Sequence, residues 1–460
     1  MKPIQLTGMP AFNLIWAGQF VSLIGSSLMR FAVGIWLYEQ TGLATTFTTM
    51  IFLSSLPRVL LSPVAGALVD RLNRKFMLMV SDLATALLTI VIFLLLQGDS
   101  LSIWHIYVLA ALSSAFEAFQ FPAYSSAVTL LVSKQHFARA SAMLSLADDA
   151  SRVLAPLLAA ALLGVIHLEG IVLLDILSFV FALSTLLLIP IPQPAQSETG
   201  RQAGRGFRKE ITYGFRFMLE RPGLLGLQAN FLMVNLMLGM STVLRTPMVL
   251  ARTGNSEVIL GVVATVMAVG GVVGGLVMSL WGGPRRRIHG VLISLIVMSL
   301  GRALLGLGQE VVLWSLGGFV IMFFIAFGNA ANQAIWLAKT PADVQGRVFA
   351  ARRFTGQLTF PLAVVISGPL ADRFFEPAMA ASGPLAPIFA PLVGMGPGAG
   401  MALLITLTAV VGLILPVLSY LIPALRNIED SLPDANLAAA TPSAPPTPST
   451  APAPQTASPN

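Results

Sequence analysis

Long apolar stretches recur along this chain and are separated by short polar connections. A helix that crosses a bilayer needs roughly 20 mostly apolar residues, because the hydrocarbon core is about 30 Å thick. Hydrophobic residues make up 56% of the chain and charged residues only 10%, so an ordinary soluble domain is excluded. Backbone groups in hydrocarbon must be hydrogen-bonded internally, which predicts a helix for each stretch and an all-α integral membrane protein. The twelve predicted spans are 11–38, 44–69, 76–96, 104–130, 140–165, 168–190, 224–250, 256–281, 288–308, 311–337, 349–371 and 398–424.

Basic residues gather in alternate connections between the spans. Twenty of the 27 lysines and arginines lie in one set of connections, whereas the other set holds only Arg252 and Arg373. Cytoplasmic loops of membrane proteins carry the excess of Lys and Arg. The distribution predicts that both termini and the long middle connection are cytoplasmic, which requires an even number of spans. It also accounts for the net charge of +7 without binding to nucleic acid.

A polar and basic segment divides the spans into two sets of six. We predict an N-terminal six-helix bundle at 1–190, a cytoplasmic central loop at 191–223 and a C-terminal six-helix bundle at 224–430. Two similar halves of six helices are a known plan for transporters, with the substrate site near the midplane between them. Residues 436–460 are nearly all Ala, Pro, Thr and Ser, and we expect the tail 431–460 to be disordered.

Several kinds of chemistry are excluded by residues that the chain lacks. It contains no cysteine, which rules out disulfides, thiolate catalysis and cysteine-ligated metal. It contains no phosphate-binding loop, so it does not carry an ATPase of its own. The four histidines (His105, His136, His167 and His289) are scattered near predicted loops. We therefore expect no cofactor, no metal and no catalytic residues, and the protein is not expected to be an enzyme.

The most specific local pattern runs from Gly66 to Lys75, at the end of the second span. Gly66 allows two helices to approach closely. Asp70 can accept hydrogen bonds from backbone amides at the start of the third span, where the helix dipole is positive. Arg71, Arg74 and Lys75 add positive charge on the cytoplasmic side. We predict a gating loop here, and the alternative is an ordinary basic turn.

The same segment resembles the loop between the second and third spans of the major facilitator superfamily. Other segments are similar to its drug-exporter branch, which includes macrolide efflux proteins and the enterobactin exporter. These segments are Gly18–Gly25, Leu56-Pro57, Phe121–Ala123, Gly346–Val348 and Gly368–Asp372. The resemblance covers roughly residues 10–430. It implies two six-helix bundles related by pseudo-two-fold symmetry, and export by alternating access.

The fifth span departs from the antiporter motif of this family, which is glycine-rich around a Gly-Pro pair. Residues Leu154–Ala160 carry alanine in place of glycine, and Asn73 replaces the usual glycine of the gating loop. An uncoupled facilitator or an importer of a small metabolite therefore stays open as an alternative. A lipid scramblase or an intramembrane enzyme is a further alternative.

Charged residues inside the predicted spans are candidates for proton coupling. A charge at a helix centre costs about 2.5–3.5 kcal/mol and usually faces a cavity or a partner. The candidate set is Arg30, Arg58, Glu117, Asp148, Asp149 and Arg152. We expect Glu117 and Asp149 to face the central cavity and at least one of them to exchange a proton. A structural ion pair of Arg152 with Asp148 or Asp149 is the alternative, because these residues share a helix face.

Uncharged polar residues in the spans are candidates for binding the substrate. They are Gln19, Ser22, Ser26, Gln120, Tyr124, Asn230, Asn235, Asn329, Asn332 and Gln333. The first three recur at helical spacing and share a face. For each residue the alternative is an interhelical hydrogen bond, typically worth about 0.6 kcal/mol. Separately, Gly270, Gly271, Gly274 and Gly275 predict close helix packing in the eighth span.

Together with the resemblance, these patterns predict a secondary transporter. We expect it to export amphipathic or lipophilic small molecules, such as macrolide-like drugs or siderophores, by proton-coupled alternating access. The expected partners are the substrate, protons and the lipid bilayer, and the chain is expected to be a monomer. It should be a multi-pass protein of the bacterial inner membrane with both termini in the cytoplasm.

Overall fold

The structure is a computed structural model that describes residues 7–190, 207–341 and 344–431. Within these ranges the chain is helical and contains no β-strand, so the all-α prediction is confirmed. The predicted tail after Ser431 and residues 191–206 of the predicted central loop lie outside the described residues.

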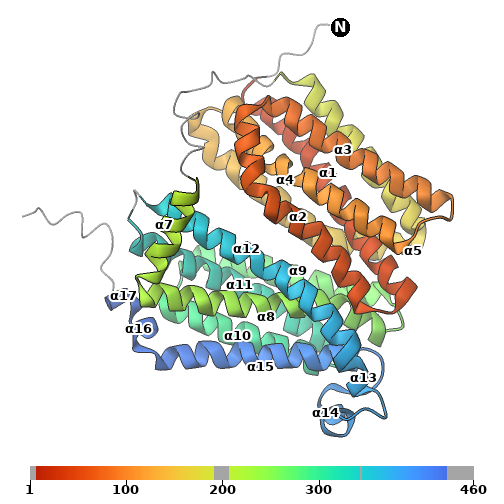
Figure 1. Cartoon of the computed structure of the whole chain (residues 1–460), viewed down its shortest axis with the longest axis vertical. Coiled ribbons are helices and arrows are strands. Elements are labelled where there is room, and N and C mark those ends of the chain that lie inside the picture. The colour runs from red at the N-terminus through yellow and green to blue at the C-terminus, as the bar shows by residue number, and fades with distance from the viewer. Residues whose placement is uncertain (1–6, 191–206, 342–343, 432–460) are drawn as a thin grey trace, which may run out of the picture.

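Two groups of long helices make up the molecule (Figure 1). The first group contains α1 (Met9–Thr41), α2 (Ala44–Arg71), α3 (Arg74–Gln97), α4 (Ile103–Leu131) and α5 (Phe137–Leu188). The second group contains α8 (Pro222–Arg252), α9 (Glu257–Trp281), α10 (Arg287–Leu307), α11 (Val311–Lys339), α12 (Gln345–Leu370) and α15 (Ala399–Leu421). The spans predicted from the apolar stretches therefore begin and end within a few residues of the helices.

Short elements connect or extend the long helices. They are η1 (Lys134–His136), α7 (Phe207–Leu219), the π-helical turn η3 (Ala371–Phe375), α13 (Glu376–Met379), α14 (Ala386–Val393), α16 (Pro423–Arg426) and α17 (Ile428–Ser431). The segment predicted as a central loop thus contains a helix, α7, which packs against α12.

The helix α5 contains two of the predicted spans. It is 52 residues long, and His167 interrupts it with a left-handed φ of 55°. Both of its ends lie beside the starts of other helices: Trp16 of α1 donates to the Met143 carbonyl, and Lys75 of α3 donates to the Ile189 carbonyl. The chain therefore reverses at His167. Eleven helices among the described residues are long and apolar enough to span a membrane, and this reversal gives the twelfth crossing.

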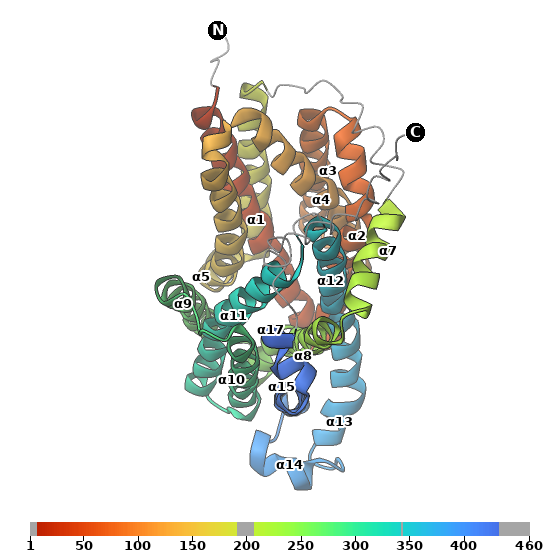
Figure 2. The same cartoon turned by 90° about the vertical axis from the view of Figure 1, so that its left-hand side faces the viewer.

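The reversals define two faces of the molecule. The near face holds the start of α1 and the α2–α3 junction, and the far face holds the α1–α2 and α8–α9 junctions. The two helix groups contact each other towards the far face, where the start of α2 meets the end of α12 and α5 packs against α9. Figure 1 shows that α2 and α12 splay apart towards the near face, and Figure 2 shows the two groups from that side.

Residues at the helix ends explain where the spans begin and end. The Asn73 side chain accepts from the Phe76 amide at 3.0 Å and caps α3, and Ser256 caps α9 through the Ile259 amide at 3.4 Å. Gly42, in the left-handed conformation with φ 66°, ends α1. Asparagine and serine at a helix start and glycine at its end satisfy backbone groups that the helix leaves unpaired.

Close packing of α9 against α11 confirms one prediction from the glycine pattern. A Cβ atom at Gly270 or Gly274 would overlap the backbone of Phe319 or Phe323 on α11. A Cβ at Gly275 would meet nothing within 4 Å. One edge of the glycine pattern is therefore in tight contact, and the other edge is open.

Candidate functional site

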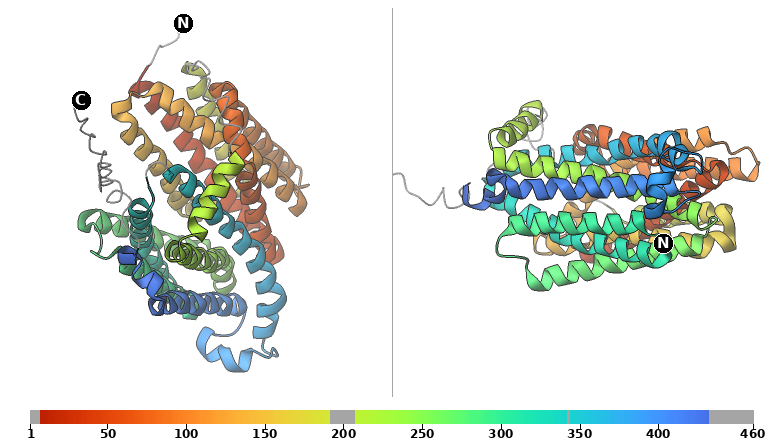
Figure 3. Two further views of the ribbon diagram at one scale, coloured as in Figure 1. Left: turned by 60° about the vertical axis from the view of Figure 1, so that its left-hand side comes forward. Right: turned by 90° about the horizontal axis from the view of Figure 1, so that it is seen from below.

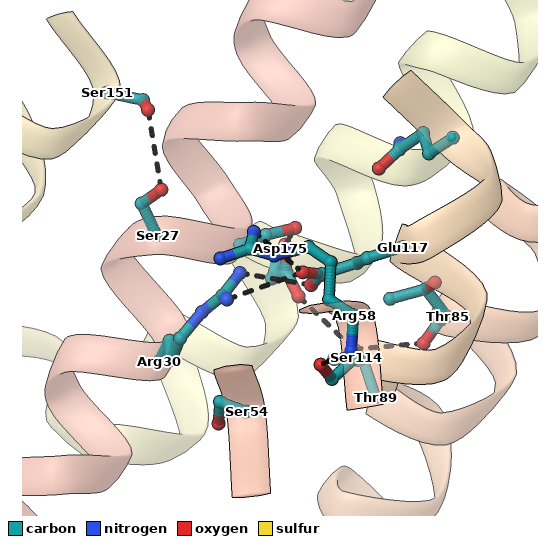
Figure 4. Close-up of polar contacts among 12 residues, drawn as sticks. Ser27, Arg30, Ser54, Arg58, Thr85, Thr89, Ser114, Glu117, Ser151 and Asp175 are labelled. Atoms are coloured by element: carbon teal, nitrogen blue, oxygen red, sulfur yellow. Dashed lines mark hydrogen bonds and ion pairs between the residues drawn. The ribbon is translucent and has the colours of Figure 1, made fainter. Parts of the chain in front are cut away.

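Glu117 of α4 lies between two arginines from neighbouring helices (Figure 4). Its Oε1 is 3.0 Å from Nη2 of Arg30 on α1, and its Oε2 is 3.6 Å from Nη1 of Arg58 on α2. The glutamate side chain is 14% exposed, whereas the arginines are 33% and 45% exposed. From helix rise, Arg58 was expected at the depth of Glu117 and Arg30 about one turn nearer the outside, and the structure places all three in one ion-paired cluster.

A backbone contact holds α2 against α4 beside this cluster. The Arg58 amide donates to the Ser114 hydroxyl at 3.2 Å. Ser114 lies three residues before Glu117, so both side chains project from the same face of α4. The position of Arg58 relative to Glu117 is therefore set by the helix pair as well as by the two charges.

Asp175, on the second arm of α5, is fully buried beside the cluster. Ser26 of α1 donates to its Oδ1 at 3.0 Å, and Thr89 of α3 donates to its Oδ2 at 3.2 Å. Gly25 makes this contact possible, because a Cβ there would lie 3.0 Å from Asp175 Oδ1. Hydroxyl groups from two other helices thus hold a carboxyl group inside the bundle.

A small cavity of about 40 Å³ joins these groups. Its wall includes Arg30, Glu117 and Asp175 together with Met29, Met50 and Ile106. All of its lining residues belong to the first helix group. The cavity places apolar side chains next to charged ones, and it lies within one group rather than between the two.

A second buried carboxyl group lies nearer the start of α1. Asp82 of α3, 1% exposed, accepts from Gln19 at 2.8 Å and from Gln120 at 2.6 Å. Gln120 also donates to the Gln19 carbonyl oxygen at 3.4 Å. The two glutamines predicted to bind substrate are therefore engaged in a buried network that joins α1, α3 and α4.

In the second group, the polar residues predicted to bind substrate differ from one another in burial and in hydrogen-bond partners. Asn230 donates to Ser419 and to the Leu415 carbonyl of α15, which is an interhelical hydrogen bond. Asn332 is fully buried, and neither atom of its amide has a hydrogen-bond partner. Gln333 is exposed and accepts from Arg352 at 2.7 Å.

The other predicted binding residues do not converge on one point. Ser22 is buried in α1, and Tyr124 is buried in α4 with a hydroxyl that has no hydrogen-bond partner. Asn235 is half-buried in α8, and Asn329 is exposed on α11. Of the predicted substrate-binding set, only Ser26 lines the cavity described above.

The predicted gating loop is described in part. Arg74 donates to the Ser126 carbonyl of α4 at 3.4 Å, and Lys75 donates to the Ile189 carbonyl after α5 at 2.8 Å. The side chains of Asp70 and Arg71, and the surroundings of Gly66, lie outside the described part of the chain. The start of α3 is capped by Asn73, at the place where a contact from Asp70 was expected.

The predicted acidic pair on α5 is also described only in part. Asp148 is exposed, and its carbonyl accepts from the Ser151 hydroxyl at 2.9 Å. The side chains of Asp149 and Arg152 lie outside the described residues. Their predicted ion pair therefore stays a prediction.

Comparison with known proteins decides the family. The family model of the Major Facilitator Superfamily matches residues 15–364, which is most of the chain. The chain belongs to the major facilitator superfamily. The predicted fold class is thereby confirmed, and the molecule is a multi-pass membrane transporter.

This superfamily member has named relatives and similar solved structures. It is 26% identical over 372 residues to macrolide efflux protein A of Streptococcus pyogenes, covering 79% of this chain and 89% of the relative. It is 24% identical over 326 residues to macrolide efflux protein A of Enterococcus faecalis, covering 69% and 98%. A bacterial homolog of the human lysosomal transporter Spinster, solved in an inward-facing and unoccupied conformation, has a TM-score of 0.66 at 15% identity, covering 92% and 99%.

Two carboxyl groups of this superfamily member were not assigned a site role from the sequence. Asp175 and Asp82 both lie within predicted spans, and that position was the available signal, because an ionisable residue inside a membrane marks a functional position by default. Which helices surround each carboxyl depends on how the bundle packs. The hydroxyl and amide partners became visible only in three dimensions.

Proposed function

We propose that this protein exports amphipathic or lipophilic small molecules from the cytoplasm and that proton movement drives the export. The observation that carries the proposal is the cavity of the first helix group, where Glu117 and Asp175 lie among apolar side chains. Methionines such as Met29 and Met50 adapt to ligands of irregular shape. The names of the macrolide efflux relatives point to the same class of substrate.

The near face is the cytoplasmic face in this proposal. It carries the basic residues Arg74 and Lys75 of the gating loop and the run Arg285–Arg287, and cytoplasmic loops are the ones enriched in Lys and Arg. The two helix groups meet towards the far face, so in this proposal the state described is the one open to the cytoplasm. A cytoplasmic substrate would enter from the near face in this state.

Glu117 is the proposed centre of proton coupling. Protonation would remove the charge that holds Arg30 and Arg58, so α1 and α2 would lose their common partner on α4. Arg30 would then pair with Asp175, which lines the same cavity. With such an exchange of partners, proton binding would stabilise one arrangement of the helices relative to the other. Coupling requires a difference of this kind.

Other predicted residues belong to the same proposal. Asp148, Asp149 and Arg152 are proposed as a second coupling position on α5. Asp70 and Arg71 are proposed to act with Arg74 and Lys75 in gating. Ser22, Asn235 and Asn329 are proposed as substrate contacts reached in other states of the cycle.

Transport by purified protein in liposomes tests the proposal. A macrolide is supplied with an imposed pH gradient, and substrate uptake and proton flux are recorded together for the wild type, Glu117→Gln and Asp175→Asn. The matched control is Glu220→Gln, which neutralises an exposed carboxylate that pairs with Arg216 at the near face. We expect coupled proton flux to be lost in Glu117→Gln and kept in the control. Coupling that persists in both cavity variants would refute the coupling assignment, and a wild type that moves no lipophilic compound would refute export.

An uncoupled facilitator is the second candidate function. The observation that favours it is the charge balance of the cluster, because two arginines face the single carboxylate of Glu117. In that case the liposome experiment would show substrate moving down its own gradient without proton flux.

A further inference from the structure

The segment between η3 and α15 contains an apolar helix on the far face. No charged residue occurs from Pro377 to Leu425. Within this stretch α14 exposes Pro387, Ile388, Pro391 and Leu392, and Met395 follows after Gly394, which ends the helix. Ile388, Leu392 and Met395 are 64%, 54% and 70% exposed. Positions separated by three and four residues within a helix share a face, so the exposed residues of α14 form an apolar stripe that faces outwards.

The opposite side of α14 is apolar as well. Ala386 and Val393 are buried, and Phe389 packs on the hydrophobic core. A helix that meets water on one side normally has polar residues there, and a helix that is apolar all round is buried or faces lipid. The exposed side of α14 therefore does not match an aqueous environment.

The position of α14 is fixed by polar contacts at its ends. Arg252 donates to the Val393 carbonyl and to the Gly308 carbonyl. Glu376 accepts from the amides of Gly398 and Met401 at 3.3 and 2.8 Å, which ties the segment to the start of α15. Figures 1, 2 and 3 show α14 protruding sideways past α15, away from the first helix group. The apolar stripe is thus held to the side of the bundle, near its far face.

We propose that α14 lies in the interfacial region of the lipid leaflet on the far face, with Ile388, Leu392 and Met395 inserted among the lipids. The exposed apolar side chains of α15, such as Ile414 and Leu418, continue the same lipid-facing surface across the bilayer. A second copy of the chain is the less suitable occupant. One face of an eight-residue helix falls well short of the about 800 Å² that each partner buries in a stable interface.

Site-specific fluorescence tests this proposal, and the natural chain is suited to it because it contains no cysteine. The variants Ile388→Cys and Leu392→Cys are labelled with a polarity-sensitive fluorophore in liposomes. The matched control is Asn255→Cys, which is exposed in the α8–α9 turn of the same face. We expect nitroxide-labelled lipids to quench most of the emission at 388 and 392, and aqueous iodide to quench only the control.

Two results would overturn the assignment of lipid as the partner. One is iodide quenching at 388 and 392 equal to that at 255. The other is protection from both quenchers that disappears when the protein is diluted in lipid, which would indicate a second copy of the chain. Both substituted side chains are exposed, so loss of folding is not expected, and macrolide binding by each labelled protein checks this point.

A second inference comes from a hexapeptide that occurs twice. Gly-x-Leu-x-Asp-Arg is found at 66–71, at the near-face end of α2, and at 368–373, at the far-face end of α12. In the second copy, Asp372 accepts from the backbone amides of Ala44 and Thr45 at 3.1 and 2.6 Å. These amides begin α2, which has no side-chain cap of its own. A carboxylate from the second helix group therefore caps a helix of the first.

The glycine of the same hexapeptide supports this contact. A Cβ at Gly368 would overlap the Thr48 hydroxyl and approach the Thr45 backbone. Gly368 and Asp372 thus contact the first turns of α2 together, one by close approach and the other by charge-assisted hydrogen bonds. Free amides at a helix start carry partial positive charge, so a carboxylate there is stabilising.

We infer that Asp372 is a latch that holds the far side closed. Separation of α2 from α12 at the far face would leave both the carboxylate and the two amides without this partner. The latch therefore stabilises the state open on the near face relative to the state open on the far face. This inference depends on alternation between the two states and not on the identity of the substrate or on proton coupling.

Distances between spin labels test the latch. The far-face pair is Asp99→Cys with Asn255→Cys, which joins exposed turns of the two groups, and the near-face pair is Ser133→Cys with Arg286→Cys. We expect Asp372→Ala to lengthen and broaden the far-face distance distribution and to shorten the near-face distance, with a smaller shift for Asp372→Asn. The matched control is Arg373→Gln, which alters the adjacent exposed charge. Unchanged distributions in both Asp372 variants would refute the latch.

Discussion

Buried ionisable side chains have different kinds of partner in the two helix groups. In the first group, the buried carboxyls Asp175 and Asp82 have hydroxyl or amide partners, and Glu117 pairs with two arginines beside a cavity. In the second group, the fully buried Arg302 donates to Ser299 at 2.6 Å and to the Val234 carbonyl, and its Nε has no partner. Its hydrogen bonds end on a hydroxyl and a carbonyl rather than on a carboxylate.

This difference separates two uses of an ionisable residue in a membrane protein. A carboxylate beside a cavity can gain a proton or change its partner, because neighbouring groups can move into the space. An arginine packed on all sides by helices has no such freedom. We therefore expect the first group to contain the residues that respond to protons, and the second group to contribute rigid packing.

The largest expected contrast is between Glu117→Ala and Arg302→Met. The first change leaves Arg30 and Arg58 without their common partner, and it should lower the free energy of unfolding by about 2 kcal/mol and abolish coupled transport. The second replaces a buried charge by an apolar chain of similar length, which is often neutral or stabilising. Thermal unfolding in detergent and liposome transport measure both effects. If Arg302→Met lowered the stability or the transport rate more than Glu117→Ala, the proposed difference between the two helix groups would be wrong.

A second contrast, in stability and not in transport, should distinguish two glycines of α9. A methyl group at Gly274 would overlap the Phe323 backbone on α11, whereas one at Gly275 would meet nothing within 4 Å. Overpacking of this kind costs about 1–3 kcal/mol, so Gly274→Ala should unfold at lower temperature while Gly275→Ala resembles the wild type. Equal unfolding temperatures for the two variants would show that the contact between α9 and α11 is looser than described.

The smallest expected effect compares one serine from each group. Ser26→Ala removes a donor to Asp175, and Ser299→Ala removes an acceptor of Arg302. Ser26→Ala should cost about 0.6 kcal/mol, the usual value for an interhelical hydrogen bond, and Ser299→Ala, whose hydrogen bond lies within α10, should cost a similar amount. Only Ser26→Ala should shift the pH dependence of transport, because only its partner is a carboxyl group beside the cavity. A shift of similar size in Ser299→Ala would show that the second group also responds to protons.

The spans could be predicted from the sequence because bilayer thickness sets their length. The position of the reversal at His167 could be predicted from the sequence, but its conformation could not. A single left-handed residue stands there in place of a loop. The segment around α7 was predicted as loop because its composition is polar, and its packing against α12 was not visible in the pattern.

The site could be predicted in part. Helix rise places Arg58 at the depth of Glu117 and Arg30 about one turn nearer the outside, and this prediction needed only span boundaries. The partners of Gln19 and Gln120 could not be predicted, because rotation of each helix about its axis decides which neighbour a side chain meets. The same limit applies to Asp372, whose amide partners lie 327 and 328 residues earlier in the chain.

Arg74 and Lys75 reach carbonyl groups at the near-face ends of α4 and α5. Three helices of the first group are thereby fastened to one another by a pair of cations. Tilting any one of them separately would break these contacts, whereas swinging them together breaks none. At the near face these three helices should therefore move as one rigid unit during transport, and they should not slide past one another.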